Sequence, residues 1–158
     1  ALAASMLVAV GAAGMAWKLN PSWDSVVAYV VDHYRHDGPK MLAQTERDSA
    51  EKVQEILSEF EVSAAPALAD IVGVIKYCPS PEGIGVHMVL NTPTGPITVI
   101  YMPETTVTDQ QTMSFDNVEA MLVELKNGSA VIIGADRGGL QDYYALVQQS
   151  IVPLPGSS

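Results

Sequence analysis

The first seventeen residues of the chain carry no charged side chain. Residues 1–17 are apolar or small, and Lys18 is the first charged residue. A helix of this length rises about 25 Å, close to the roughly 30 Å hydrocarbon core of a bilayer. Trp17 and Lys18 are residue types that favour a membrane interface. We therefore predict an apolar anchor helix over residues 1–19, inserted in a membrane through residues 1–17.

Two other interpretations of this segment stay open. A secretory signal peptide also contains an apolar stretch with small residues. Alternatively, the helix packs in a protein interior or against partner subunits, because Gly11 and Gly14 allow close approach of another helix.

The charge balance excludes one class of partner. Eight Lys and Arg face eighteen Asp and Glu, the net charge is −10, and the sequence has no basic run. Nucleic-acid binding depends on clustered basic side chains that replace counterions on phosphates. We expect no nucleic-acid partner. Adsorption to anionic lipid is disfavoured for the same reason, so membrane attachment would depend on the apolar segment.

Residues 20–60 have helical periodicity. Ser22 is a plausible N-cap of a helix that ends near Gly38-Pro39, and Thr45 is a plausible cap of a second helix. Apolar residues recur three and four positions apart in both segments: Trp23, Val26, Val27, Val30, Val31 and Tyr34 in the first, and Val53, Ile56, Leu57 and Phe60 in the second.

From Asp70 onward the pattern is typical of β-structure. Pro and Gly separate three apolar runs at residues 71–77, 86–90 and 97–102, and residues 104–116 are polar enough to predict a loop. Asn127-Gly128 between the runs 120–126 and 129–135 predicts a hairpin with a type I′ turn. A last helix is predicted over residues 140–151. Residues 20–158 are thus expected to form one α+β domain, with a five-stranded, mainly antiparallel sheet, two preceding helices and one C-terminal helix.

The sequence lacks the common signatures of enzymes. It contains no P-loop, dinucleotide-binding fingerprint, nucleophile elbow, His-Glu-x-x-His or Cys-x-x-Cys motif. The glycine-rich residues 134–139 fit neither phosphate-binding spacing and are interpreted as a turn. We therefore expect a protein that is not an enzyme.

Four residues form a candidate metal site: His33, His36, Cys78 and His87. The first two lie three positions apart on the predicted helix, Cys78 ends the first strand, and His87 lies in the strand expected to pair with it. Imidazole and thiolate ligands suit zinc or copper. Met88 should face the side of the strand opposite to His87. The alternative is structural: Cys78, the only cysteine, acts as a buried small hydrophobe, and the two helical histidines form a polar helix end.

The order of these motifs resembles a known family. An apolar span is followed by Asp32-His33-Tyr34-Arg35-His36, Tyr77-Cys78, and a run from Gly85 to Leu90, and then by residues 95–103. This order is similar to that of uncharacterised bacterial single-span inner-membrane proteins that look like anti-sigma regulators. Such proteins have a cytoplasmic N-terminal region, one membrane helix and an outer C-terminal domain, and are often encoded beside an extracytoplasmic-function sigma factor.

The resemblance implies an inner-membrane protein with residues 20–158 in the periplasm. A sigma factor would bind only a cytoplasmic region that this sequence lacks, whereas the outer domain would contact another protein or a signal. We therefore hypothesise a periplasmic sensory or scaffold domain of a membrane-anchored regulator, with transition-metal binding as a subordinate hypothesis. The alternative is a structural or assembly subunit whose N-terminal apolar helix packs against partner subunits.

Overall fold

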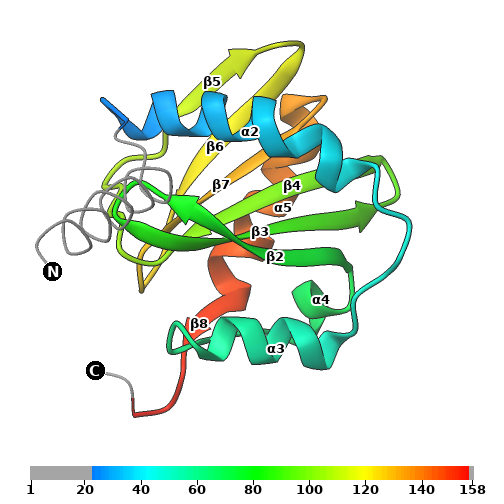
Figure 1. Ribbon diagram of the computed structural model, residues 1–158, viewed down its shortest axis with the longest axis vertical. Coiled ribbons are helices and arrows are strands. Elements are labelled where there is room, and N and C mark those ends of the chain that lie inside the picture. Colours follow the sequence, from blue (N-terminus) through cyan, green and yellow to red (C-terminus); the bar gives the residue numbers. More distant parts are fainter. Residues whose placement is uncertain (1–22, 157–158) are drawn as a thin grey trace, which may run out of the picture.

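The computed structural model describes residues 23–156 and has an α+β fold in three layers (Figure 1). A large antiparallel sheet forms the middle layer. Among residues 23–156, no helix is both long and apolar enough to span a bilayer. The predicted anchor helix over residues 1–19 lies outside the described residues.

The first described helix, α2 (Val26–Leu42), is the helix predicted from the apolar spacing. Its N-cap is Ser25, not Ser22, and the Ser25 hydroxyl accepts a hydrogen bond from the Ala28 amide at 3.1 Å. The helix also continues through Gly38 and Pro39, which were expected to end it. Pro39 donates no backbone hydrogen bond, but its carbonyl still accepts one from Ala43 at 3.1 Å.

The second predicted helix is α3 (Ala50–Ser58), capped by Ser49 and not by Thr45. It buries Val53, Ile56 and Leu57, as its spacing predicted. It leads into strand β1 (Val62–Ala64) and the short helix α4 (Pro66–Ala69). Strand β1 pairs antiparallel with the last strand, β8 (Ile151–Pro153), in a separate two-stranded sheet. Three-residue strands are too short to show a period of two, so the sequence did not predict them.

The main sheet has six strands and not the five expected. They are β2 (Val72–Ser80), β3 (Gly83–Thr92), β4 (Gly95–Met102), β5 (Thr112–Phe115), β6 (Val118–Glu124) and β7 (Ser129–Gly134). Their order across the sheet is β2-β3-β4-β7-β6-β5, and each adjacent pair is antiparallel.

The additional strand, β5, lies in the segment that was expected to be a loop. It is joined to β6 by Asp116 and Asn117, whose φ values of 46° and 64° are the positive pair that a type I′ turn requires. The hairpin predicted around Asn127-Gly128 is confirmed as β6–β7. Its connection is a longer loop, residues 125–128, because strand pairing ends at Glu124 and Ser129. The type I′ turn is therefore one hairpin earlier than predicted.

Both faces of the sheet are covered. Helix α2 lies on one face, and α3, α4 and α5 (Arg137–Ser150) lie on the other (Figure 1). The larger apolar cluster lies on the side of α3 and α5 and includes Met88, Tyr101 and Ile132. The smaller cluster joins Tyr29 and Val30 of α2 to the opposite sheet face. Helix α2 is thus a separate layer above an otherwise complete sheet.

Substitution of Gly128 tests the geometry of the β6–β7 loop. Its φ is +75°, and a Cβ there would lie 2.6 Å from the Pro103 carbonyl oxygen and against that of Met102. Gly95 is the matched control, with a φ of +119° and no atom within 4 Å of the position that a Cβ would take. Both Gly→Ala changes introduce backbone strain, but only Gly128→Ala adds a clash. We expect Gly128→Ala to lose roughly 1 kcal/mol or more beyond Gly95→Ala in urea unfolding. Equal losses would contradict this loop geometry.

Candidate functional site

A row of side chains on the sheet faces α2. In the strand register, Lys76 of β2 lies opposite His87 of β3, and His87 lies opposite Ile100 of β4. Because side chains alternate along a strand, Val86 and Met88 point to the other face and join the cluster under α3 and α5. The predicted opposition of His87 and Met88 is confirmed.

His87 meets His33 of α2 in a buried pair. The His33 Nε2 and His87 Nδ1 atoms are 3.1 Å apart, and the two rings are tilted by 53°. The residues are 4% and 0% exposed. Tyr29, one turn earlier on α2, stacks on His33 with ring centroids 5.4 Å apart. The pair therefore joins α2 to β3, the strand next to the β2 edge of the sheet, through a polar contact inside an apolar layer.

The proton positions follow from the neighbours. A hydrogen bond between two imidazole nitrogens holds one proton, so one ring donates and the other accepts. Asp37 Oδ2 lies 3.9 Å from His33 Nδ1 and favours a proton on that nitrogen. His33 Nε2 then accepts from His87 Nδ1. His87 Nε2, which is buried and has no hydrogen-bond partner within the described chain, is left as a bare acceptor.

Both imidazoles are neutral at neutral pH. Burial is the main cause that lowers the pKa of His87, to about 3, and repulsion by His33 and Lys76 adds to it. Burial also lowers the pKa of His33, although attraction by Asp37 opposes it. The 3.9 Å contact between His33 and Asp37 is accordingly a contact of a neutral ring with a carboxylate, not an ion pair.

Asp37 lies beside the pair at the edge of the α2 layer. Its Oδ1 is 3.5 Å from Lys40 Nζ and 3.9 Å from Lys76 Nζ. Partial burial opposes ionisation, but attraction by Lys76 and Lys40 outweighs it and lowers the pKa of Asp37. Lys76, Asp37 and the imidazoles thus connect β2, α2 and β3.

Cys78 lies on the same sheet face, next to Tyr29. The Tyr29 hydroxyl is 4.0 Å from Cys78 Sγ and donates a hydrogen bond to the Pro79 carbonyl at 2.9 Å. Burial raises the pKa of the Cys78 thiol to about 12, so the thiol is protonated and a poor nucleophile at neutral pH.

The structure brings together only part of the predicted metal site. His33 and His87 are in contact, Cys78 lies on the same face beside Tyr29, and His36 is exposed. Three helical positions correspond to a rotation of about 60° around the axis, which turns His36 away from the buried stripe that contains His33. Within residues 23–156, no three His, Cys, Asp or Glu side chains are grouped to hold a metal ion. The structure thus identifies no metal ligand among them.

Sequence reasoning missed three neighbours of the pair: Tyr29, Asp37 and Lys76. Two of them were visible as helical neighbours, because Tyr29 and Asp37 lie four positions before and after His33 and share its side of the helix. Lys76 became a neighbour only through the β2–β3 register, which the sequence did not predict.

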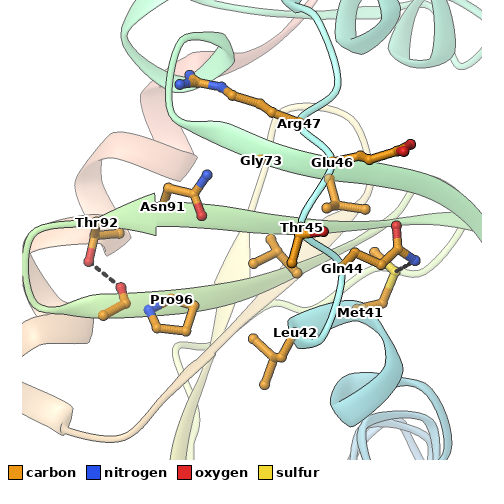
Figure 2. A pocket seen from close by; sticks show the side chains of 13 residues that line it. Met41, Leu42, Gln44, Thr45, Glu46, Arg47, Gly73, Asn91, Thr92 and Pro96 are labelled. Atoms are coloured by element: carbon orange, nitrogen blue, oxygen red, sulfur yellow. Dashed lines mark hydrogen bonds between the residues drawn. The ribbon is translucent and has the colours of Figure 1, made fainter.

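A pocket of about 310 Å³ lies at the C-terminal end of α2. Figure 2 shows it between the end of the helix, the loop that follows it, and strands β2, β3 and β4. Met41, Val74 and Val89 form a buried apolar cluster at its base. Its charged lining residues, Glu46 and Arg47, are exposed, and Arg47 donates to the Asp70 carbonyl. The lining includes no imidazole and no thiol, so its chemistry is separate from that of the histidine pair.

Fold and site together define a small α+β domain in which a helix is docked on an antiparallel sheet through two buried imidazoles. Residues 1–151 match the model of a family described as "Protein of unknown function (DUF3379)", and the chain therefore belongs to this family. Comparisons with curated proteins and with solved structures gave no match.

Tyr29→Phe tests the contact between α2 and β2. The change removes a buried hydroxyl and leaves the Pro79 carbonyl without this donor, so we expect a loss of about 1 kcal/mol in the free energy of unfolding. Tyr77→Phe is the control, since its hydroxyl bonds Glu59 at the exposed surface. Urea unfolding should show a much smaller effect for Tyr77→Phe. Similar losses from both variants would contradict the buried contact.

Proposed function

We propose that this protein is a membrane-anchored regulator whose described domain senses a signal or acts as a scaffold outside the cytoplasm. The observation that carries the proposal is the position of α2. It is the first described helix, it follows the charge-free segment in the sequence, and it lies on the sheet as a separate layer. A change in α2 docking would therefore act on the part of the chain next to the proposed anchor.

The contacts of α2 suit a helix that can lie on the sheet or leave it. It packs on the sheet through side chains from Val26 to Met41. Several of its contacts are polar: Tyr29 with Pro79, His33 with His87, and Arg35 with Asp116 of the β5–β6 turn. Polar contacts lose less than apolar ones when water replaces them. The strand ladder of the sheet is formed without α2, so the domain could retain its core after the helix moves.

The same features favour regulation over catalysis. The thiol of Cys78 is buried and protonated, and the two buried imidazoles bond each other. We propose that a protein partner contacts the domain in the periplasm, and that a sigma factor would bind only a cytoplasmic region outside residues 1–158.

A topology reporter tests the location. Alkaline phosphatase fused after Ser158 in the full-length gene product should be active in a Gram-negative host, because this reporter enzyme needs the oxidising periplasm. A fluorescent protein that folds only in the cytoplasm, fused at the same position, should show no fluorescence. The reverse result would contradict the periplasmic location. A large, defined oligomer that needs no detergent would then favour the assembly-subunit alternative.

A matched pair of valines tests the regulatory role. Val30 lies on the buried side of α2 and is 0% exposed, whereas Val27 on the same helix is 40% exposed. Val30→Asp should displace α2, because a carboxylate cannot replace an apolar contact in the buried layer. In the native host we expect Val30→Asp to change a small set of transcripts several-fold, and Val27→Asp to change none.

Deletion of residues 23–158 provides the second arm of this experiment. It should alter the same transcripts as Val30→Asp, because both remove the docked state of α2. If neither the deletion nor Val30→Asp changes any transcript, the proposed regulatory role is wrong.

A further inference from the structure

We propose that the His33–His87 pair makes the docking of α2 sensitive to acid: the helix lies on the sheet while both imidazoles are neutral, and it leaves the sheet when they take up protons. The inference rests on the proposed sensory role, to which it adds the identity of the signal. Its physical basis is the geometry of the pair and of the groups around it.

The pair can hold only a limited number of protons while the two rings stay in contact. The 3.1 Å gap between His33 Nε2 and His87 Nδ1 accommodates one proton. A second proton in this gap would place two N–H groups against each other. A proton on His87 Nε2 would instead be a buried donor with no acceptor in the described chain. Both imidazoles can become fully protonated only if the rings separate and reach water.

Charged and titratable groups surround the pair. Helix α2 contributes Tyr29, Asp32, His36 and Asp37, and β2 contributes Lys76 and Cys78. The neighbour from β4, Ile100, carries no charge. Asp37 is the nearest carboxylate, 3.9 Å from His33, and Lys76 and Lys40 already pair with it. No carboxylate within residues 23–156 forms an ion pair with His87, so an imidazolium there would have only the attraction of Asp37, a carboxylate that is already paired.

The direction of the pH effect follows from these surroundings. A free histidine has a pKa of about 6.5, whereas burial in the docked state lowers the pKa of both histidines. Docking is therefore fully favoured above about pH 6.5 and becomes less favourable as the pH falls below it. Each histidine that stays neutral in the docked state shifts the equilibrium toward undocking by up to about tenfold per pH unit.

The other attachments of α2 do not change in this range. The pKa of Asp37 is lowered, as described above, and a hydrogen bond from Arg35 lowers the pKa of Asp116, so both carboxylates stay ionised near pH 5. The Tyr29–Pro79 bond involves a hydroxyl whose pKa is raised by burial. The imidazole pair is thus the part of the α2 interface that responds between pH 7.5 and pH 5.

Release of α2 would expose an apolar surface. The sheet residues that Tyr29 and Val30 cover include Ile100, Met102, Leu122, Val131 and Ile133. An uncovered patch of this kind is a site for protein association. A fall in pH would thereby make this face of the sheet accessible to a protein partner.

Amide hydrogen exchange of the full chain, in detergent or nanodiscs, tests the inference. Protection factors of α2 amides are compared with those of α5 amides at pH 7.5 and pH 5.0, each corrected for the intrinsic exchange rate. We expect α2 to lose protection at least tenfold at pH 5.0 while α5 keeps its protection. His36→Gln is the matched control, because it removes the exposed histidine of the same helix and should leave the response unchanged.

The double variant His33→Gln/His87→Gln should abolish the response, since amide side chains can hydrogen-bond but do not titrate in this range. If this variant fails to dock α2 at pH 7.5, a histidine NMR titration of the wild-type chain decides: two imidazoles must gain protons together with the loss of α2 protection. Equal protection of α2 at both pH values, or parallel loss in α2 and α5, overturns the inference. Because these measurements use no transcriptional output, they can fail while the proposed regulatory role holds, and the reverse is also true.

Discussion

One hydrogen bond between two buried imidazoles joins α2 to the sheet. The bond between the buried rings of His33 and His87 requires that a single proton lie between them, and the nearest carboxylate, Asp37, already pairs with Lys40 and Lys76. This requirement ties the position of a helix to the protonation state of two residues that lie 54 positions apart in the sequence. Apolar contacts of Val30 and Met41 hold the same helix, but they do not depend on pH.

The sheet determines where this bond can form. Alternation along β3 directs His87 to α2 and Met88 to the opposite core, and the antiparallel register places Lys76 beside His87. The helix contributes His33 from the middle of its buried stripe, with Tyr29 and Asp37 one turn to either side. A local pattern on each element thus produces a polar site, although neither element contains a recognisable motif.

The sequence predicted what depends on local periodicity. The amphipathic pattern located α2 and α3, apolar runs separated by Pro and Gly located β2, β3 and β4, and Asn127-Gly128 located the β6–β7 hairpin. The sequence did not predict elements that have no hydrophobic period of their own. Strands β1 and β8 have three residues each, and the polar β5 is held by its pairing with β6. For the site, residue types alone suggested His33 and His87. Only the tertiary fold could separate them from His36, because the way α2 packs on the sheet buries His33 and leaves His36 exposed.

The tertiary arrangement also changes the chemistry expected of these residues. Imidazoles and a thiol in one sequence suggest ligands, whereas burial and mutual hydrogen bonding make the same groups a neutral contact between two layers. The most direct measurement of this account is a ¹⁵N NMR experiment on the histidine rings at pH 7. The account predicts a scalar coupling across the hydrogen bond between His33 Nε2 and His87 Nδ1, with one proton on each ring. Absence of the coupling together with two charged imidazolium rings would contradict it.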